Sequence, residues 1–294
     1  MSVFTGAGVA LVTPFHADGT VNYDKLDELL EEQVKGGTDA IVICGTTGES
    51  ATLTEEEHSE VIRFACERIK GRIPVVAGTG SNCTETAIQL SREAEADGAD
   101  AVLLVSPYYN KTTQKGLKEH YQAIADEIHI PAILYNVPSR TGVNIKPETI
   151  AWLCGNVENI VGVKEASGDF SAIAQIANLS DGTVDIWSGN DDQTVPMMAL
   201  GAKGVISVWS NVAPTVVHDM CRAFFDGDTA RAMKMQIEAI PLLNALFCET
   251  NPIPVKTAMN LMGKNVGPFR RPLVDMEPEN LERLKKAMQG AGLL

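Results

Sequence analysis

Eight short apolar runs alternate with amphipathic stretches over residues 1–226 of the chain. The runs begin near residues 8, 40, 74, 101, 132, 160, 184 and 204, and turn-forming residues follow each of them. In the stretches between them, apolar residues recur every three or four positions, as on a helix with one buried face. Strands that alternate with such helices form a parallel sheet buried on both faces. Eight units without a ninth strand predict a closed (β/α)₈ TIM barrel and not an open doubly wound sheet.

From residue 227 to residue 294 the pattern is helical only. One apolar stripe comprises Met233, Ile237, Ile240 and Leu243, and a second comprises Leu281, Leu284 and Met288. We therefore predict two parts. Residues 1–226 form the catalytic barrel, and residues 227–294 form an appended C-terminal helical region that is not a separate catalytic domain.

Charge and cysteine usage narrow the classes of function. The chain of 294 residues has a formal net charge of −14 at pH 7 and no basic stripe, which argues against nucleic acid as a partner. The cysteines and histidines lack metal-ligand spacing, and no glycine cluster completes a dinucleotide fingerprint, so we expect neither metal nor cofactor. We find no signal-peptide pattern and no apolar run of the ~18 residues that span a membrane, and we expect a cytoplasmic protein.

Polar residues that suit carbonyl chemistry follow the predicted strands. Active sites of (β/α)₈ barrels lie at the C-terminal ends of the strands, which meet at one mouth of the barrel. The residues at these ends are Thr46 and Thr47 after the second strand, Tyr109 after the fourth, Tyr135 at the end of the fifth, Lys164 at the end of the sixth and Ser188–Asn190 after the seventh. We therefore expect a lysine that lies among hydroxyl groups.

Lys164 is the candidate nucleophile of this group. A free lysine, with a pKa of about 10.4, is neutral in only about one molecule in 10³ to 10⁴ at pH 7. Burial in an apolar barrel wall lowers that pKa, and the neutral amine attacks a carbonyl to form a Schiff base. A tyrosine hydroxyl held by a threonine hydroxyl suits the proton transfers that follow. By itself, the stretch around Lys164 is also typical of a structural lysine whose ammonium reaches water at a strand end.

Two other polar features have structural explanations. Lys256 lies in the helical tail and not at the end of a strand, so we do not expect it to be the nucleophile. Asp191 and Asp192 are adjacent, as the ligands of a divalent ion can be. An acidic first turn of a helix, which the helix dipole favours, explains the pair better.

Four ordered motifs resemble those of one enzyme family. They are Gly45–Glu49, Pro107–Lys111, Tyr135–Gly142 and Gly162–Gly168. They resemble the dihydrodipicolinate synthase family, a member of the pyruvate-dependent aldolase superfamily that includes N-acetylneuraminate lyase, and the resemblance covers essentially the whole chain. It implies a Schiff-base lyase that condenses pyruvate with L-aspartate 4-semialdehyde to give 4-hydroxy-tetrahydrodipicolinate, in lysine and diaminopimelate biosynthesis.

The resemblance also implies which residues carry the reaction. Lys164 forms the imine with pyruvate, and Tyr135 acts as proton donor and acceptor. Thr46 and Tyr109 complete the proton relay, and Tyr109 in this family reaches the site of a neighbouring subunit. The resemblance therefore implies a homotetramer, because Tyr109 would have no role in a monomer.

Residues that bind the two substrates follow from the same resemblance. Thr47 and the backbone near Ile206 hold pyruvate, and Gly189 lines the pocket. Arg140 meets the carboxylate of the aldehyde substrate, and a guanidinium does bind a carboxylate at two points. Ala166 stands where the N-acetylneuraminate lyase branch tends to carry threonine. Two alternatives stay open: a pyruvate aldolase for a 2-keto-3-deoxy sugar acid, and a non-catalytic small-molecule sensor on a barrel scaffold.

The resemblance finally implies a regulatory site, because lysine inhibits many bacterial members at a subunit interface. The matching positions are Ser50, Ala51, Glu55, His58, Asn82, Thr86 and Tyr108. Thr86 replaces a glutamate that pairs with the amine of the ligand in sensitive members, and Glu55 replaces a frequent histidine. We therefore predict weak or absent inhibition by lysine.

Overall fold

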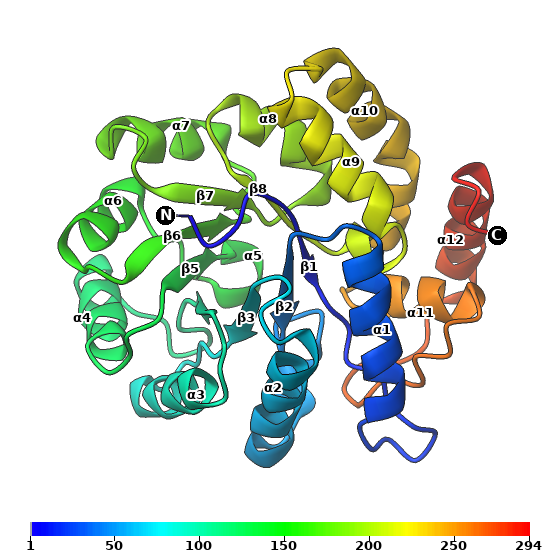
Figure 1. The fold of residues 1–294 in the computed structure, drawn as a ribbon, viewed down its shortest axis with the longest axis horizontal. Helices are drawn as coiled ribbons and strands as arrows, with labels where there is room; N and C mark the ends of the chain where they lie inside the picture. The colour runs from blue at the N-terminus through cyan, green and yellow to red at the C-terminus, as the bar shows by residue number, and fades with distance from the viewer. Residues whose placement is uncertain (1) are drawn as a thin grey trace.

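The chain folds into a closed barrel of eight parallel strands in a computed structural model, which describes residues 2–294. Each strand pairs with its neighbours in sequence, and β8 pairs with β1 to close the barrel. Helices surround the barrel (Figure 1), so the predicted (β/α)₈ TIM barrel is confirmed. The strands are β1 (Gly6–Ala10), β2 (Ala40–Ile43), β3 (Val75–Gly78), β4 (Ala101–Val105), β5 (Ala132–Asn136), β6 (Ile160–Glu165), β7 (Asp185–Ser188) and β8 (Gly204–Ser207).

The two faces of the barrel wall belong to two separate apolar clusters. Side chains alternate between the faces of a strand. Val9 and Ile41 belong to the larger cluster, which includes residues of the surrounding helices. Val42, Ile133 and Trp187 belong to the smaller cluster, which fills the barrel interior. Both faces are therefore buried, which explains why the strands appear in the sequence as continuous apolar runs.

The helices connect successive strands and cover the barrel. Side chains cap two of the helix starts: Asn22 accepts a hydrogen bond from the backbone of Lys25, and Thr54 with Glu57 forms a capping box. Short elements within loops were not predicted, namely α5 (Pro138–Thr141) and the 3₁₀ turns η1 (Ser50–Thr52), η2 (Asp191–Gln193) and η3 (Trp209–Asn211). The barrel helices are α1 (Tyr23–Lys35), α2 (Glu55–Ile69), α3 (Thr84–Ala96), α4 (Gln114–Ala125), α6 (Pro147–Asn156), α7 (Phe170–Leu179), α8 (Thr194–Ala199) and α9 (Pro214–Phe225).

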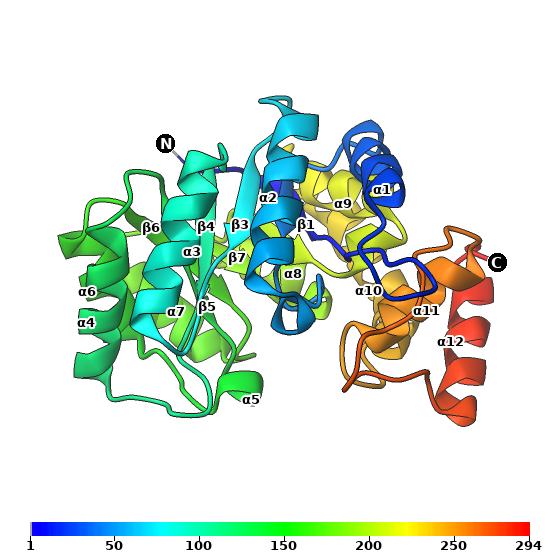
Figure 2. The ribbon, with the colours of Figure 1, turned by 90° about the horizontal axis from the view of Figure 1, so that it is seen from below.

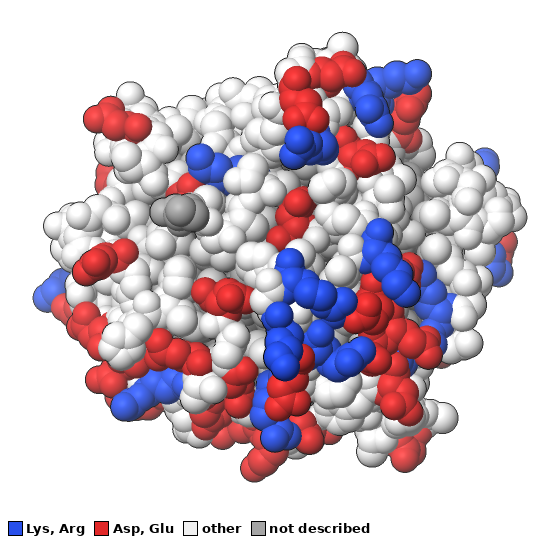
Figure 3. Space-filling view, in the orientation of Figure 1, with Lys and Arg blue, Asp and Glu red and all other residues white. Residues whose placement is uncertain are grey.

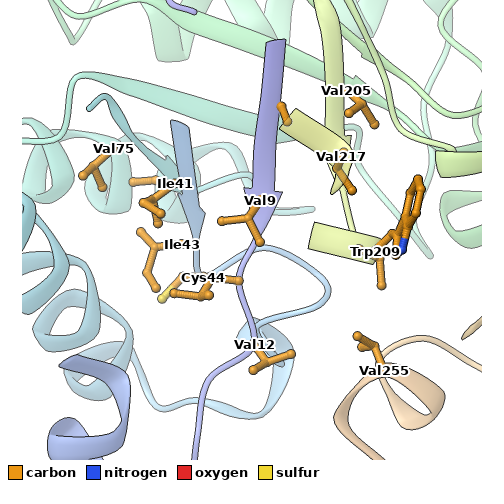
Figure 4. Packing of buried hydrophobic residues seen from close by; sticks show 14 of the residues in the cluster. Val9, Val12, Ile41, Ile43, Cys44, Val75, Val205, Trp209, Val217 and Val255 are labelled. Carbon is orange, nitrogen blue, oxygen red and sulfur yellow. The ribbon is translucent and has the colours of Figure 1, made fainter. Parts of the chain in front are cut away.

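Three further helices follow α9, as the helical spacing after residue 227 predicts. They are α10 (Thr229–Leu246), α11 (Ile253–Leu261) and α12 (Pro278–Gly290). In Figure 2, α11 and α12 lie to one side of the barrel. Val255 of α11 is fully buried in the same cluster as Val12 and Trp209, near the exits of β1 and β8 (Figure 4). The C-terminal helices therefore share the apolar core of the barrel.

The surface carries both signs of charge. On the face that Figure 3 shows, Lys and Arg side chains lie among Asp and Glu side chains. Arg68 pairs with Asp27, and Arg72 pairs with Glu31, so part of the basic charge is neutralised between α1 and α2. Within residues 2–294, no helix is long and apolar enough to cross a membrane, and no group of His, Cys, Asp and Glu residues is arranged to hold a metal ion.

Candidate active site

Lys164 and Tyr135 lie side by side on the inner wall of the barrel. They are paired neighbours in the register of β5 and β6, and Trp187 of β7 is the neighbour of Lys164 on its other side. The Lys164 Nζ atom lies 4.5 Å from the centroid of the Tyr135 ring. Lys164 is 6% exposed and Tyr135 is 7% exposed. The predicted nucleophile is therefore a buried amine against an aromatic ring, and not a strand-end lysine that reaches solvent.

Burial sets the protonation behaviour of Lys164. It lowers the pKa of the amine to about 8, a shift that the Asp191 carboxylate opposes and the Arg140 guanidinium reinforces. The adjacent Glu165 side chain does not offset this, because it is bound elsewhere. Its Oε2 atom accepts a hydrogen bond of 2.9 Å from Asn136, and its Oε1 atom accepts one of 2.7 Å from the backbone of Ser167. With this pKa, about a tenth of Lys164 is neutral at pH 7, far more than for a free lysine.

The rate of imine formation should follow this pKa. We expect the rate with pyruvate to rise about tenfold per pH unit below pH ~8 and to level off above it, because only the neutral amine attacks. In Arg140→Ala, loss of the guanidinium should raise the Lys164 pKa and move the profile to higher pH. Rapid borohydride quenching and peptide mass analysis across pH 6–9.5, a range set by this pKa, would measure both profiles. A rate independent of pH in wild-type protein would contradict the expectation.

Thr46 and Thr47 bring hydroxyl groups to the site from the loop after β2. Burial raises the pKa of the Tyr135 hydroxyl, and the neighbouring Arg140 and Thr46 side chains oppose that rise. Thr47 is 2% exposed, and its hydroxyl accepts a hydrogen bond of 2.9 Å from the Asn251 side-chain amide. The two threonines therefore face different partners, Thr46 toward Tyr135 and Thr47 toward the C-terminal helical region.

Gly189 and Ile206 occupy the exits of β7 and β8. A Cβ atom at Gly189 would lie 2.6 Å from the Ala166 Cβ and 3.2 Å from the Lys164 Cε. Glycine at this position therefore leaves room for the lysine side chain. Ile206 is fully buried in the cluster that fills the barrel interior. Gly189 directly follows β7, which pairs with the strand of Lys164, and Ile206 lies within β8. Their predicted roles in pyruvate binding stay predictions.

Asn251 links two loops that the sequence places in the site. Its side-chain amide donates to Thr47, and its backbone oxygen accepts a hydrogen bond of 2.9 Å from Arg140 Nη2. Asn251 precedes α11, so the C-terminal helical region contributes directly to the site. Sequence reasoning missed this residue, because nothing in the pattern around position 251 shows where its side chain points.

A cavity of about 410 Å³ joins the candidate active site to the predicted regulatory positions. Thr46, Arg140 and Asn251 line it on the side of the active site. Of the predicted regulatory residues, those in its lining are Ser50, Ala51, His58, Thr86 and Tyr108. Asn82 lies nearby, where its backbone oxygen accepts a hydrogen bond of 2.9 Å from Asn110. The expectation of weak lysine inhibition stays a prediction.

Tyr109 lies apart from the other predicted catalytic residues within this chain. It is 92% exposed and has a φ of 69°, a left-handed conformation that non-glycine residues seldom adopt. Tyr108, by contrast, is 39% exposed and lines the cavity. The single chain therefore brings together Lys164, Tyr135 and Thr46 but not Tyr109.

Asp191, like Asn251, makes contacts in the structure that the sequence did not indicate. Asp191 and Asp192 form the acidic first turn of η2, as predicted, and Asp192 is exposed. Asp191 is 2% exposed, and its Oδ2 atom accepts hydrogen bonds of 2.9 and 3.0 Å from the backbone of Val208 and Trp209. The carboxylate thus holds the segment that follows β8. An aspartate in the loop after a strand is no signal for such a contact.

Comparison with known proteins shows the family of the chain. A model of the dihydrodipicolinate synthetase family matches residues 3–291. The chain belongs to that family. The 4-hydroxy-tetrahydrodipicolinate synthase of Lachnoclostridium phytofermentans is 58% identical over 294 residues, which cover 100% of both chains.

Solved structures of dihydrodipicolinate synthases share the whole fold. The enzyme from Cyanidioschyzon merolae with lysine bound is 40% identical, with a TM-score of 0.97 and 100% of each chain covered. The enzyme from Acinetobacter baumannii complexed with pyruvate is 42% identical, with a TM-score of 0.95 and 99% of each chain covered. The family that the four motifs predict is therefore confirmed, and α10, α11 and α12 lie within the match to the dihydrodipicolinate synthetase family.

Proposed function

We propose that the chain is a Schiff-base lyase that condenses pyruvate with L-aspartate 4-semialdehyde to give 4-hydroxy-tetrahydrodipicolinate, in lysine and diaminopimelate biosynthesis. The observation that carries the proposal is Lys164, a buried amine of lowered pKa beside Tyr135. Relatives that carry the name of this activity match the chain over its full length. A non-catalytic sensor would have no use for such an amine, so the sensor alternative is not favoured.

In the proposed reaction, the neutral Lys164 amine attacks the C2 carbonyl of pyruvate to form a carbinolamine. Loss of one water leaves a protonated imine, and loss of a proton from C3 gives an enamine. Tyr135, with Thr46 beside it, is placed to give and take the protons of these steps. The raised pKa of Tyr135 keeps its hydroxyl protonated between transfers.

The second half of the reaction joins the two substrates. The enamine carbon attacks the aldehyde carbon of L-aspartate 4-semialdehyde, and the aldehyde oxygen takes a proton to become the hydroxyl group of the product. The amino group of the substrate then adds to the imine carbon, and the Lys164 amine leaves as the ring closes. Arg140, held by the backbone oxygen of Asn251, supplies the guanidinium for the carboxylate of this substrate.

Arg140 distinguishes this function from cleavage of a 2-keto-3-deoxy sugar acid. We expect Arg140→Ala to lower kcat/KM for L-aspartate 4-semialdehyde about 100-fold, because the carboxylate loses a charged partner. Imine formation with pyruvate above about pH 9, where the amine is neutral, should stay within about threefold of wild type, because that step lacks the second substrate. Arg140→Lys keeps the charge but not the two-point geometry. Its kcat/KM for L-aspartate 4-semialdehyde should therefore lie between those of wild type and Arg140→Ala. Efficient cleavage of sugar acids by wild-type protein would contradict the proposal.

The assembly and the location of the protein are part of the proposal. A tyrosine that is 92% exposed and strained at positive φ would gain a role if Tyr109 entered the site of a neighbouring chain. We therefore propose a homotetramer in which Tyr109 completes the proton relay. We also propose that the enzyme acts in the cytoplasm, and that residues 1–226 form the catalytic barrel to which residues 227–294 are attached.

A further inference from the structure

The turn after β2 presents hydrogen-bond donors that no group of the chain accepts. Within residues 2–294, the backbone N–H groups of Thr46 and Thr47 donate to no other group, and neither does the Thr47 hydroxyl. Thr46 lies toward the Tyr135 hydroxyl, and the Lys164 amine lies 4.5 Å from the centroid of the Tyr135 ring. Donors grouped in one turn near a buried amine suit the carboxylate of a small keto acid.

Asn251 fixes the direction of the Thr47 hydroxyl. Its side-chain N–H group donates a hydrogen bond of 2.9 Å to Thr47 Oγ1, and the two residues are 7% and 2% exposed. A hydroxyl oxygen accepts hydrogen bonds at its lone pairs and donates its single proton in another direction. Because the Asn251 amide occupies an acceptor position, the Thr47 proton stays available for an anion beside the turn.

The fold alone does not explain an asparagine at position 251. The Oδ1 atom of Asn251 is buried and has no hydrogen-bond partner within residues 2–294. A buried acceptor without a partner lowers stability, so the amide stands there at an energetic cost. Asn251 also lines the cavity of the candidate active site, together with Thr46 and Arg140. An amide that is unfavourable for stability and lies at the edge of the site indicates a role in binding.

We propose that Asn251 is a positioning residue that keeps the Thr47 hydroxyl pointed at the carboxylate of pyruvate. The amide acts through Thr47 and does not itself touch the substrate. A donor that is already oriented binds an anion without the entropic cost of fixing the hydroxyl. The inference deepens the proposed function, since it rests on pyruvate as the first substrate and on the predicted role of Thr47 in holding it.

The backbone of Asn251 serves the second substrate instead. Its carbonyl oxygen accepts a hydrogen bond of 2.9 Å from Arg140 Nη2, and Arg140 is the proposed partner of the carboxylate of L-aspartate 4-semialdehyde. A substitution at position 251 removes the side-chain amide but leaves that carbonyl oxygen. Asn251→Ser should therefore weaken the binding of pyruvate and leave the KM for L-aspartate 4-semialdehyde within about threefold of wild type.

The test measures the pyruvate concentration that half-saturates borohydride trapping on Lys164. We expect Asn251→Ser to raise this concentration about tenfold, because the shorter side chain cannot hold the Thr47 hydroxyl. In Asn251→Asp, which has nearly the same shape, the carboxylate only accepts hydrogen bonds. The Thr47 hydroxyl would then donate to it and not to pyruvate, and the rise should be about 100-fold. Asn178→Asp changes an exposed asparagine of α7 and should match wild type.

A purely structural role for Asn251 would make Asn251→Asp the milder variant, because it preserves the shape of the side chain, and that order would overturn the proposal. In Thr47→Val, which lacks the hydroxyl, Asn251→Ser should add less than about twofold, and a full tenfold loss there would also overturn it. If neither variant of Asn251 folded, the asparagine would serve the fold, and the proposal would be overturned as well. A wild-type protein that trapped no pyruvate would refute the proposed function itself, whereas wild-type half-saturation in Asn251→Asp would refute only this inference.

Discussion

Replacing Lys164 with alanine should lower kcat/KM for the condensation by about 10⁴-fold or more, the loss expected when a covalent nucleophile is removed. No other amine in the site takes its place. Lys256 is fully buried at the end of another network, where its Nζ atom lies 2.6 Å from a Glu49 carboxylate oxygen. Lys164→Ala should fold normally, because it removes a buried amine whose charged form is unfavourable there.

Borohydride reduction with pyruvate, followed by peptide mass analysis, measures this result directly. Wild-type protein should carry one pyruvate adduct on Lys164, and Lys164→Ala should carry none. Lys164→Arg is the matched control, since it keeps a long cationic side chain that cannot form the imine. An adduct on another lysine, or substantial turnover by either variant, would show that the nucleophile has been assigned wrongly.

The barrel could be predicted from the sequence because its strands are buried on both faces. Each strand appears as an apolar run, and eight runs that alternate with helical spacing leave few other folds. Short elements within the loops were missed because they leave no periodic pattern in the sequence. The helix α5 has four residues, Pro138–Thr141, which is too few for any periodic pattern to emerge.

The inner wall of the site was predictable for the same reason as the barrel. Tyr135 and Lys164 end apolar runs, and the sequential strand order of the barrel makes their strands neighbours. Contacts between distant loops were not predictable. Asn251 and Asp191 lie 204 and 17 residues from the partners of their side chains, Thr47 and Val208, and no local pattern encodes either hydrogen bond. Their roles depend on how the C-terminal helices and the strand exits pack.

The C-terminal helical region supports the site more closely than its sequence suggests. Its helical spacing predicts an appended helical region that is not a separate catalytic domain. In the structure, Asn251 holds Thr47 and Arg140, and Gln236 holds the turn of Asp191. The family match extends over all three C-terminal helices. The barrel and the helices thus form the site together.

A buried ion pair of Lys256 and Glu49 also connects the C-terminal helical region to the barrel. Both side chains are fully buried, and the second oxygen of Glu49 accepts a hydrogen bond of 3.1 Å from the backbone of Arg270. The Lys256 Nζ atom also lies 4.1 Å from the centroid of the Phe15 ring. Glu49 has a φ of 55° at the end of the turn that carries Thr46, so the pair fixes a strained turn to α11.

Lys256→Met should therefore destabilise the protein by about 3–5 kcal/mol, because it leaves the Glu49 carboxylate buried without a partner. The double variant Lys256→Met/Glu49→Gln should recover part of that loss, since it removes the uncompensated charge. Lys115→Met is the control for a solvent-exposed pair with Glu119 and should change stability by less than about 0.5 kcal/mol. Thermal unfolding should show a Tm lower by roughly 6–20 °C for Lys256→Met. If Lys256→Met and Lys115→Met unfolded at the same temperature, the buried pair would not anchor the turn.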